Sequence, residues 1–245
     1  GENLNSIDQA DAVLDEYLGV LQDASEAGLD LEISVKLTQL GLDFGPEVAQ
    51  ERLRRLAEST PFLVWIDMES SDYVDATLEV FRNVMLTNTN LGLCLQSYLR
   101  RTENDLESLL PLDPSIRLVK GAYKEPKEVA YPHKREVDEH YFQLSRVLLE
   151  ARLNGGVARP VIATHDTRMI ESVNHMAAEL GVGKDDYEFA MLYGIERREQ
   201  HRLANSGHVV RVLISYGPSW FPWYMRRLAE RPANVWFVAK QLFRS

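Results

Sequence analysis

Short apolar runs alternate with longer amphipathic segments from one end of the chain to the other. Most of the short runs are apolar along their whole length, which is typical of strands covered on both faces. The longer segments repeat apolar residues three or four positions apart, as helices do. The pattern predicts strands at Leu31–Leu37, Phe62–Met68, Leu91–Gln96, Ile116–Ala122, Val161–Thr164, Glu188–Leu192 and Val209–Ser215, and helices that include Val48–Glu58, Asp75–Val84, Glu136–Arg152 and Ile170–Leu180.

Regular alternation of strand and helix favours a parallel sheet. An open sheet that binds a nucleotide would usually carry a glycine-rich turn after its first strand, and Thr38-Gln-Leu-Gly41 is not such a turn. Polar residues instead end most of the strands, where a (β/α)8 barrel keeps its active site. We therefore expect an α/β fold, a distorted TIM-like (β/α)8 barrel, in one domain over residues 1–245. Only seven strands are predicted, so the first strand of the barrel should precede Gly1. The polar strand ends are Lys36, Asp67, Gln96, Lys120 and His165.

Composition and charge exclude several classes of partner. The formal net charge of −10 over 245 residues argues against nucleic acid and against adhesion to anionic lipid. No apolar run is long enough to span a bilayer, and no secretory signal is visible at the N-terminus. The lone Cys94 lies in an apolar run and is expected to be a buried thiol. A reducing, cytoplasmic location fits, with a peripheral contact to the inner membrane through an electron acceptor as an option.

Lys36 and Asp67 are candidate site residues because each is a charge at the end of an apolar strand. A lysine in Ile33-Ser-Val-Lys-Leu37 must be paired or must reach a cavity, unless the strand is an edge and Lys36 faces water. Asp67 ends Val64-Trp-Ile-Asp67 and could pair with a cation across the barrel mouth. The alternative for Asp67 is a helix N-cap.

Two further strand ends carry polar groups. Arg117-Leu-Val-Lys-Gly-Ala-Tyr123 places a cation at each end of a strand and a glycine where the chain leaves the barrel. That glycine permits a flat ligand to approach the backbone closely. Ala163-Thr-His-Asp166 ends another strand, although a histidine in that position is more often structural than catalytic. No spacing of His, Asp or Glu indicates a metal site.

Arg226 and Arg227 lie side by side in the aromatic segment Trp220–Pro232. On a helix they would point about 100° apart, so one could bind a carboxylate while the other braces a second anion. Glu230 is four residues after Arg226 and could hold it in place. The alternative is a solvated basic face on which Trp223 stacks over an arginine.

Taken together and in order, these motifs resemble the proline dehydrogenase family, from the first residue to about Asn234. The resemblance implies a barrel with non-covalent FAD at its C-terminal mouth, and a first strand that ends just before the Gly-Glu pair. It also implies hydride transfer from proline to flavin N5, giving Δ1-pyrroline-5-carboxylate, with electrons passed on to a quinone or another acceptor. The matching motifs are Gly1-Glu2, Ser34–Leu37, Ile66–Glu69, Leu95–Tyr98, Arg117–Tyr123, Ala163–Asp166, Glu188-Phe189 with Leu192–Gly194, and Met225–Pro232.

The resemblance also implies a role for individual residues. Asp67 would position the cationic cluster, and Arg117 would lie beside the reactive face of the flavin near N5. Glu2 would gate the pocket by pairing with Arg226. Substrate would be bound by Lys36, Arg226 and Arg227 at its carboxylate and walled by Tyr123, Leu192, Leu213 and Trp223, while Met68, Gln96, Lys120, Gly121, Ala122, Thr164 and His165 would hold the cofactor.

Three positions depart from the family pattern. Leu213 and Trp223 stand where tyrosines that shape the substrate pocket are usual, and Ala190 stands where a glutamine usually contacts flavin. These changes suit a hydroxylated, methylated or N-substituted proline, or another cyclic amino acid, as an alternative substrate. Two other readings are a flavin-binding barrel that acts as a regulator, and a cofactor-free barrel aldolase that uses Lys36 as a Schiff base.

Overall fold

The strands form one parallel sheet that curls into part of a barrel. The computed structural model describes residues 4–217. Strands that follow one another in the chain are neighbours in the sheet, and every pair is parallel. In this part of the chain β1 and β7 are the two edges, and no eighth strand joins them. The strands are β1 (Ile33–Val35), β2 (Val64–Ile66), β3 (Leu91–Gln96), β4 (Ser115–Val119), β5 (Arg159–Ala163), β6 (Glu188–Leu192) and β7 (Val209–Leu213).

All seven predicted strands are present, which confirms the parallel (β/α) reading, but several are shorter than predicted. The strand predicted for Leu31–Leu37 is limited to Ile33–Val35, because a 3₁₀ helix begins at Leu37. The strand predicted for Ile116–Ala122 stops at Val119, since Gly121 takes a φ of 108°, which extended backbone does not adopt. Lys36 and Lys120 therefore lie just beyond their strands, at the carboxyl edge of the sheet.

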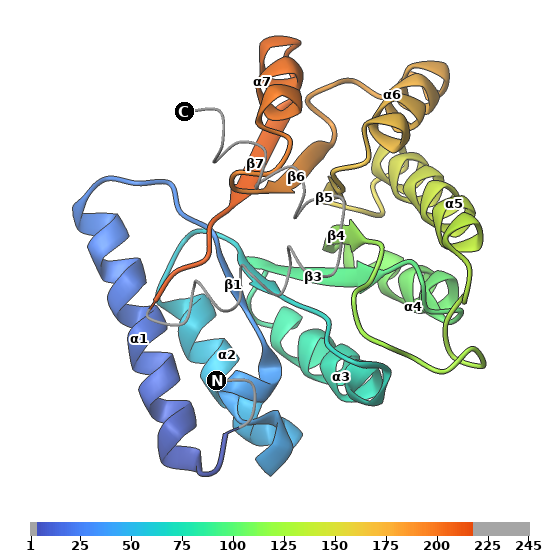
Figure 1. Cartoon of the computed structure of the whole chain (residues 1–245). Coiled ribbons are helices and arrows are strands. Elements are labelled where there is room, and N and C mark those ends of the chain that lie inside the picture. The colour runs from blue at the N-terminus through green and yellow to red at the C-terminus, as the bar shows by residue number, and fades with distance from the viewer. Residues whose placement is uncertain (1–3, 218–245) are drawn as a thin grey trace, which may run out of the picture.

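Helices cover the outside of the curl, as Figure 1 shows. The four predicted helices are present within a few residues of their expected bounds, and the structure adds α1, α4 and α7. No helix within residues 4–217 is long and apolar enough to cross a membrane. The helices are α1 (Ile7–Glu26), α2 (Pro46–Glu58), α3 (Val74–Met85), α4 (Thr102–Leu109), α5 (Lys134–Leu153), α6 (Thr167–Leu180) and α7 (Arg197–Asn205), with 3₁₀ turns η1 (Leu37–Leu40), η2 (Leu42–Phe44), η3 (Ser71–Tyr73) and η4 (Leu110–Leu112).

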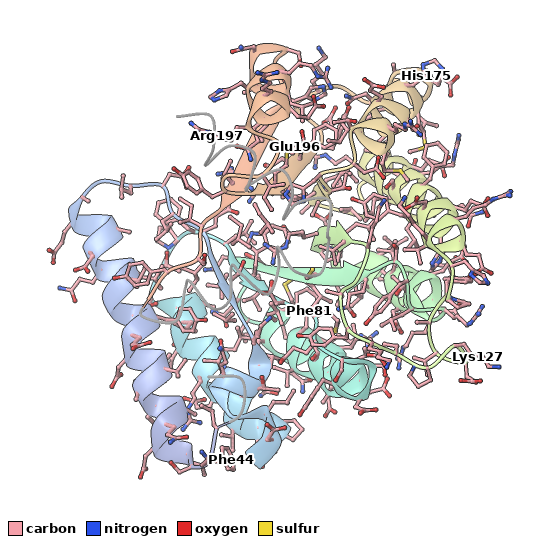
Figure 2. All side chains as sticks on the ribbon, viewed as in Figure 1. Phe44, Phe81, Lys127, His175, Glu196 and Arg197 are labelled. Atoms are coloured by element: carbon pink, nitrogen blue, oxygen red, sulfur yellow. The ribbon has the colours of Figure 1, made fainter. Side chains whose placement is uncertain are left out.

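The two faces of the sheet have different compositions. The outer face carries fully buried apolar residues such as Val35, Ile66 and Leu93, which pack in the main core with helix residues such as Phe81 (Figure 2). Side chains alternate along a strand, so the intervening positions point into the barrel. Those positions include polar side chains such as Ser34 and Arg117, together with Trp65. The alternation therefore builds an apolar shell between sheet and helices and a barrel interior that holds most of the buried charges of the strands.

Candidate active site

Lys36, Asp67 and Arg117 meet inside the barrel near the carboxyl ends of β1, β2 and β4. Lys36 Nζ lies 3.3 Å from Asp67 Oδ2, and Arg117 Nη2 lies 2.5 Å from Asp67 Oδ1. Arg117 Nη1 also donates to Ser34 Oγ at 3.1 Å. The expectations that Lys36 is paired and that Asp67 pairs with a cation are confirmed, and the alternatives of a solvated lysine and a helix cap are wrong.

The electrostatics keep both cations charged. Burial acts to lower the pKa of Lys36, but Asp67, Tyr123 and Glu69 together outweigh it, so the pKa of Lys36 is raised above its ordinary value. For Arg117, burial also acts to lower the pKa, but Asp67, Cys94 and Glu32 together raise it. Lys36 and Arg117 share the Asp67 carboxylate, and each remains a cation that can interact with an anion.

Glu69 supports the turn that carries Lys36. Its carboxylate accepts hydrogen bonds from the Thr38 backbone N–H at 3.1 Å and from Thr38 Oγ1 at 2.7 Å. Burial nevertheless raises the pKa of Glu69, although the bonds from Thr38 and the charge of Lys36 oppose that shift. Glu69 thus ties the 3₁₀ turn after β1 to the end of β2.

Gln96 presents a buried acceptor at the end of β3. Its Nε2 donates to the Met68 carbonyl at 3.2 Å. Gln96 is only 3% exposed, and its Oε1 has no hydrogen-bond partner within residues 4–217. Buried polar atoms are normally hydrogen-bonded, so this oxygen indicates a donor supplied from outside the described chain.

The segment after β4 is held by ion pairs and by a close glycine contact. Lys120 Nζ lies 2.5 Å from Asp138 Oδ1 and 3.0 Å from Asp166 Oδ2, beside a cleft of about 380 Å³ that these two aspartates help to line. Gly121 packs so tightly on Tyr98 that a Cβ would come within 2.2 Å of its ring. Ala122 is exposed.

His165 connects β5 to β6. Its Nε2 accepts a hydrogen bond from the Leu192 backbone N–H at 2.8 Å, so the ring is held with Nε2 unprotonated. Thr164 Oγ1 accepts from the Asp166 backbone N–H at 3.1 Å. No group of three or more His, Cys, Asp or Glu within residues 4–217 is arranged to hold a metal ion.

The remaining pocket candidates fall into two groups. Tyr123 lies close enough to Lys36 to influence its pKa, and Leu213 pairs with Leu192 across β6 and β7. Ala190 of β6 pairs with Ala163 of β5. Four candidates, Glu2, Trp223, Arg226 and Arg227, lie outside the described residues.

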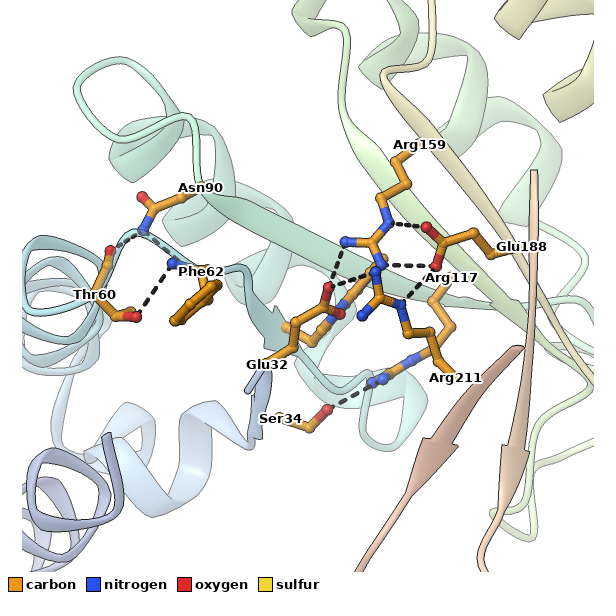
Figure 3. Close-up of polar contacts among 10 residues, drawn as sticks. Glu32, Ser34, Thr60, Phe62, Asn90, Arg117, Arg159, Glu188 and Arg211 are labelled. Carbon is orange, nitrogen blue, oxygen red and sulfur yellow. Dashed lines mark hydrogen bonds and ion pairs between the residues drawn. The ribbon is translucent and has the colours of Figure 1, made fainter. Parts of the chain in front are cut away.

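A second charged cluster lies deeper in the barrel, and the candidate residues of the sequence analysis do not include it. Arg159 makes two bonds to Glu188, at 2.7 Å each, and one to Glu32 at 2.6 Å. Arg211 adds a 3.1 Å bond to Glu188, as Figure 3 shows. The available signal was a single charge in or just before an otherwise apolar strand, as at Glu32, Arg159, Glu188 and Arg211. We call Glu32, Arg159, Glu188 and Arg211 the floor network.

The chain matches the family model described as proline dehydrogenase over residues 1–240. It is 39% identical over 243 residues to proline dehydrogenase 2 of Bacillus subtilis (strain 168), covering 98% of this chain and 78% of that protein. It is 38% identical over 252 residues to proline dehydrogenase of Deinococcus radiodurans, covering 100% of this chain and 80% of that protein.

Solved structures agree on the fold. Proline utilization A from Bdellovibrio bacteriovorus, inactivated by N-propargylglycine, superimposes with a TM-score of 0.75 and 26% identity over 86% of this chain. Proline utilization A from Corynebacterium freiburgense gives a TM-score of 0.75 with 23% identity over 94% of this chain. The chain spans only 27% and 28% of those two proteins. By family model, sequence identity and fold, the chain belongs to the proline dehydrogenase family.

Proposed function

We propose that this chain oxidises L-proline to Δ1-pyrroline-5-carboxylate with FAD as the hydride acceptor, and that residues 1–245 form the single barrel domain that does so. The observation that carries the proposal is the group formed by Lys36, Asp67 and Arg117, in a chain of the proline dehydrogenase family. Members of this family are generally FAD-dependent oxidoreductases acting on CH–NH donors.

The residues at the barrel mouth fit a flavin. The unpartnered Oε1 of Gln96 is a buried acceptor suited to a ring N–H. Gly121 has no side chain and packs on the ring of Tyr98, and Arg117 is a fixed cation. Met68, Lys120, Ala122, Thr164 and His165 complete the set that would hold the cofactor. When bound, FAD supplies the redox step by accepting a hydride at N5, while the protein binds and orients its partners.

Lys36 would bind the substrate carboxylate. Its raised pKa keeps the amine protonated at neutral pH, which suits an ion pair with an anion. Arg226 and Arg227 would complete the clamp, with Glu2 as its gate. A protonated lysine cannot attack a carbonyl, so the same observation argues against a Schiff-base aldolase.

Arg117 would stabilise the negative charge that develops on the reduced flavin. A cation fixed in a buried site acts more strongly than one in water, because it needs no reorganisation. Asp67 holds Arg117 and Lys36 by one oxygen each, so it sets the distance between the cofactor end and the substrate end of the site. The electrons would then pass to a quinone or another acceptor, with the cytoplasm as the place of action.

The experiment is anaerobic bleaching of the bound flavin by L-proline and by a panel of cyclic amino acids. We expect proline to bleach the flavin, and Lys36→Met to raise the proline concentration needed at least tenfold while the flavin content stays the same. Lys184→Met, which removes an exposed lysine far from the site, is the matched control. A yellow protein that no cyclic amino acid bleaches would overturn the catalytic proposal and favour a regulatory flavin-binding barrel.

A substituted proline is the second candidate substrate, favoured by the apolar residues at Leu213 and Ala190. Leu213 offers only apolar surface, so a methyl substituent could pack on it for roughly 0.8 kcal/mol per methylene group. With Trp223, Tyr123 and Leu192 it would wall the pocket. Leu213→Tyr should then shift kcat/KM toward unsubstituted proline relative to a methylated analogue. An unchanged ratio would show that Leu213 does not shape the pocket.

A further inference from the structure

Trp65 connects the Lys36–Asp67–Arg117 group to the floor network. It is an inward-facing residue of β2 and is 3% exposed. The Arg117 guanidinium lies over its indole, with Cζ 4.9 Å from the ring centroid. The Arg159 guanidinium of the floor network also lies over it, at 5.8 Å. One aromatic side chain therefore contacts a cation from each of the two clusters.

The indole is fixed in position from two sides. Its Nε1 donates a hydrogen bond to Glu32 Oε2 at 2.8 Å, and Glu32 is itself held by Arg159. On the neighbouring strand, Gly92 pairs with Trp65, and a Cβ at Gly92 would come within 2.4 Å of the ring. The absence of a side chain at Gly92 is what allows the indole to lie flat against β3. Trp65 is thus a rigid surface rather than a loose core residue.

Arg117 needs such a surface. Asp67 and Ser34 accept hydrogen bonds from its two terminal nitrogens, and the Cys94 side chain is a further partner, although sulfur is a weak acceptor. The two strong hydrogen bonds fix two points of the guanidinium, and its plane can still tilt about the line that joins them. The indole of Trp65 lies against the guanidinium and opposes that tilt, because a face-on contact is the favoured geometry for a cation and a ring.

We propose that Trp65 is a positioning residue that sets the orientation of Arg117 and thereby tunes the flavin. The inference rests on the proposed function in one respect, the placement of Arg117 beside the flavin. A tilted Arg117 would stabilise the negative charge of reduced flavin less well. The midpoint potential should then become more negative, and proline should reduce the flavin more slowly, while proline binding through Lys36 changes little.

The test is a double-mutant cycle in the flavin-loaded protein. Trp65→Leu removes the ring, Trp65→Phe keeps a ring face but loses the bond to Glu32, and Arg117→Met removes the cation. We measure the flavin midpoint potential and the rate constant for reduction by proline. Phe81→Leu is the matched control, because Phe81 is a fully buried aromatic residue in the apolar shell. Figure 2 labels its position in α3.

We expect Trp65→Leu to slow reduction roughly tenfold, the size of one lost cation–π contact, and to make the potential more negative. Trp65→Phe should fall between Trp65→Leu and the parent protein. In the Arg117→Met background Trp65→Leu should have no further effect on either quantity, and Phe81→Leu should leave the potential unchanged. Equal effects of Trp65→Leu with and without Arg117, or no effect on the potential, would overturn the proposal.

A second measurement keeps the test decisive if the proposed function fails. If proline does not bleach the parent protein, the proposed function is overturned. The contact between Trp65 and Arg117 is then tested by urea unfolding of the parent protein, Trp65→Leu, Arg117→Met and the double variant. Unfolding free energies that are not additive for Trp65 and Arg117 support positioning of Arg117 by Trp65. Additive values overturn it. Circular dichroism identifies a variant that does not fold, and Trp65→Phe then replaces Trp65→Leu in the cycle.

Discussion

Asp67 and Arg117 are 50 positions apart in the sequence, yet Asp67 Oδ1 lies 2.5 Å from Arg117 Nη2. The same carboxylate holds Lys36 through its other oxygen. A single residue at the end of β2 therefore fixes cations from β4 and from the end of β1. The consequences for activity and stability can be measured separately.

Asp67→Asn should lower both the activity and the stability of the protein. An amide cannot neutralise two cations, and breaking a buried ion pair from one side costs about 3 to 5 kcal/mol when the pair is dry, and less here because Asp67 is partly exposed. We expect kcat/KM for proline to fall about 100-fold or more, since Arg117 and Lys36 are no longer fixed. Steady-state kinetics and urea unfolding test this. Asp72→Asn, an exposed carboxylate on the next turn, should change neither quantity.

Glu188→Ala should destabilise the fold, although Glu188 is not one of the residues proposed to contact the substrate. Glu188 neutralises both Arg159 and Arg211, so its removal leaves two cations deep in the barrel short of a partner. We expect a loss of about 3 kcal/mol in the free energy of unfolding. Glu51→Ala removes an exposed ion pair with Arg54 and should cost less than about 0.5 kcal/mol. Similar losses for the two variants would contradict a structural role for the floor network.

Gly121→Ala should lower the stability of the fold far more than Gly155→Ala. Both glycines have positive φ, 108° and 75°, so alanine strains the backbone at each. Only at Gly121 would the new Cβ also collide with the ring of Tyr98, whereas nothing lies within 4 Å at Gly155. Thermal unfolding should show a drop of about 1 kcal/mol for Gly155→Ala and several times that for Gly121→Ala. Flavin content should fall only in the Gly121 variant.

Cys94 should be unreactive in the folded protein. Burial raises the pKa of its thiol, although Arg117 opposes the shift, so the reactive thiolate is scarce and inaccessible. It is the only cysteine in the chain. A thiol reagent at pH 8 should therefore modify about one thiol per chain in urea and almost none in buffer. Rapid modification of the native protein would show that the barrel interior opens to solvent.

Tyr17→Phe should reduce the fall in the free energy of unfolding at alkaline pH. Burial, with the charge of Asp67 as the next cause, raises the pKa of Tyr17 to about 12. An unfolded tyrosine ionises near pH 10, so the folded state keeps its proton longer. Its contribution is complete below pH 10 and is lost as the pH rises through 12. Urea unfolding at pH 9 and pH 11 should show a smaller difference in the variant, by roughly 1 kcal/mol. An equal difference would contradict the raised pKa.

The sequence by itself determined the order of the strands and the place of α2, α3, α5 and α6. Apolar runs such as Leu91–Gln96 and Glu188–Leu192 match β3 and β6 residue for residue, because a strand covered by helices must be apolar on its outer face. The same periodicity identified Lys36, Asp67, Gln96 and Lys120 as polar residues at strand ends. Strand lengths were overestimated where a turn begins, as at Gly121, because backbone dihedral angles leave little trace in hydropathy.

Only the tertiary structure decided which polar residues meet. Glu32 reaches Arg159 across 127 positions, and Arg117 reaches Ser34 across 83. Trp65 joins the two groups because Gly92 leaves it room. Such pairings depend on the register of seven strands and on the curl of the whole sheet, which are properties of all the strands together. A local pattern specifies that a side chain points into the barrel, whereas the curl of the sheet determines which side chains it contacts there.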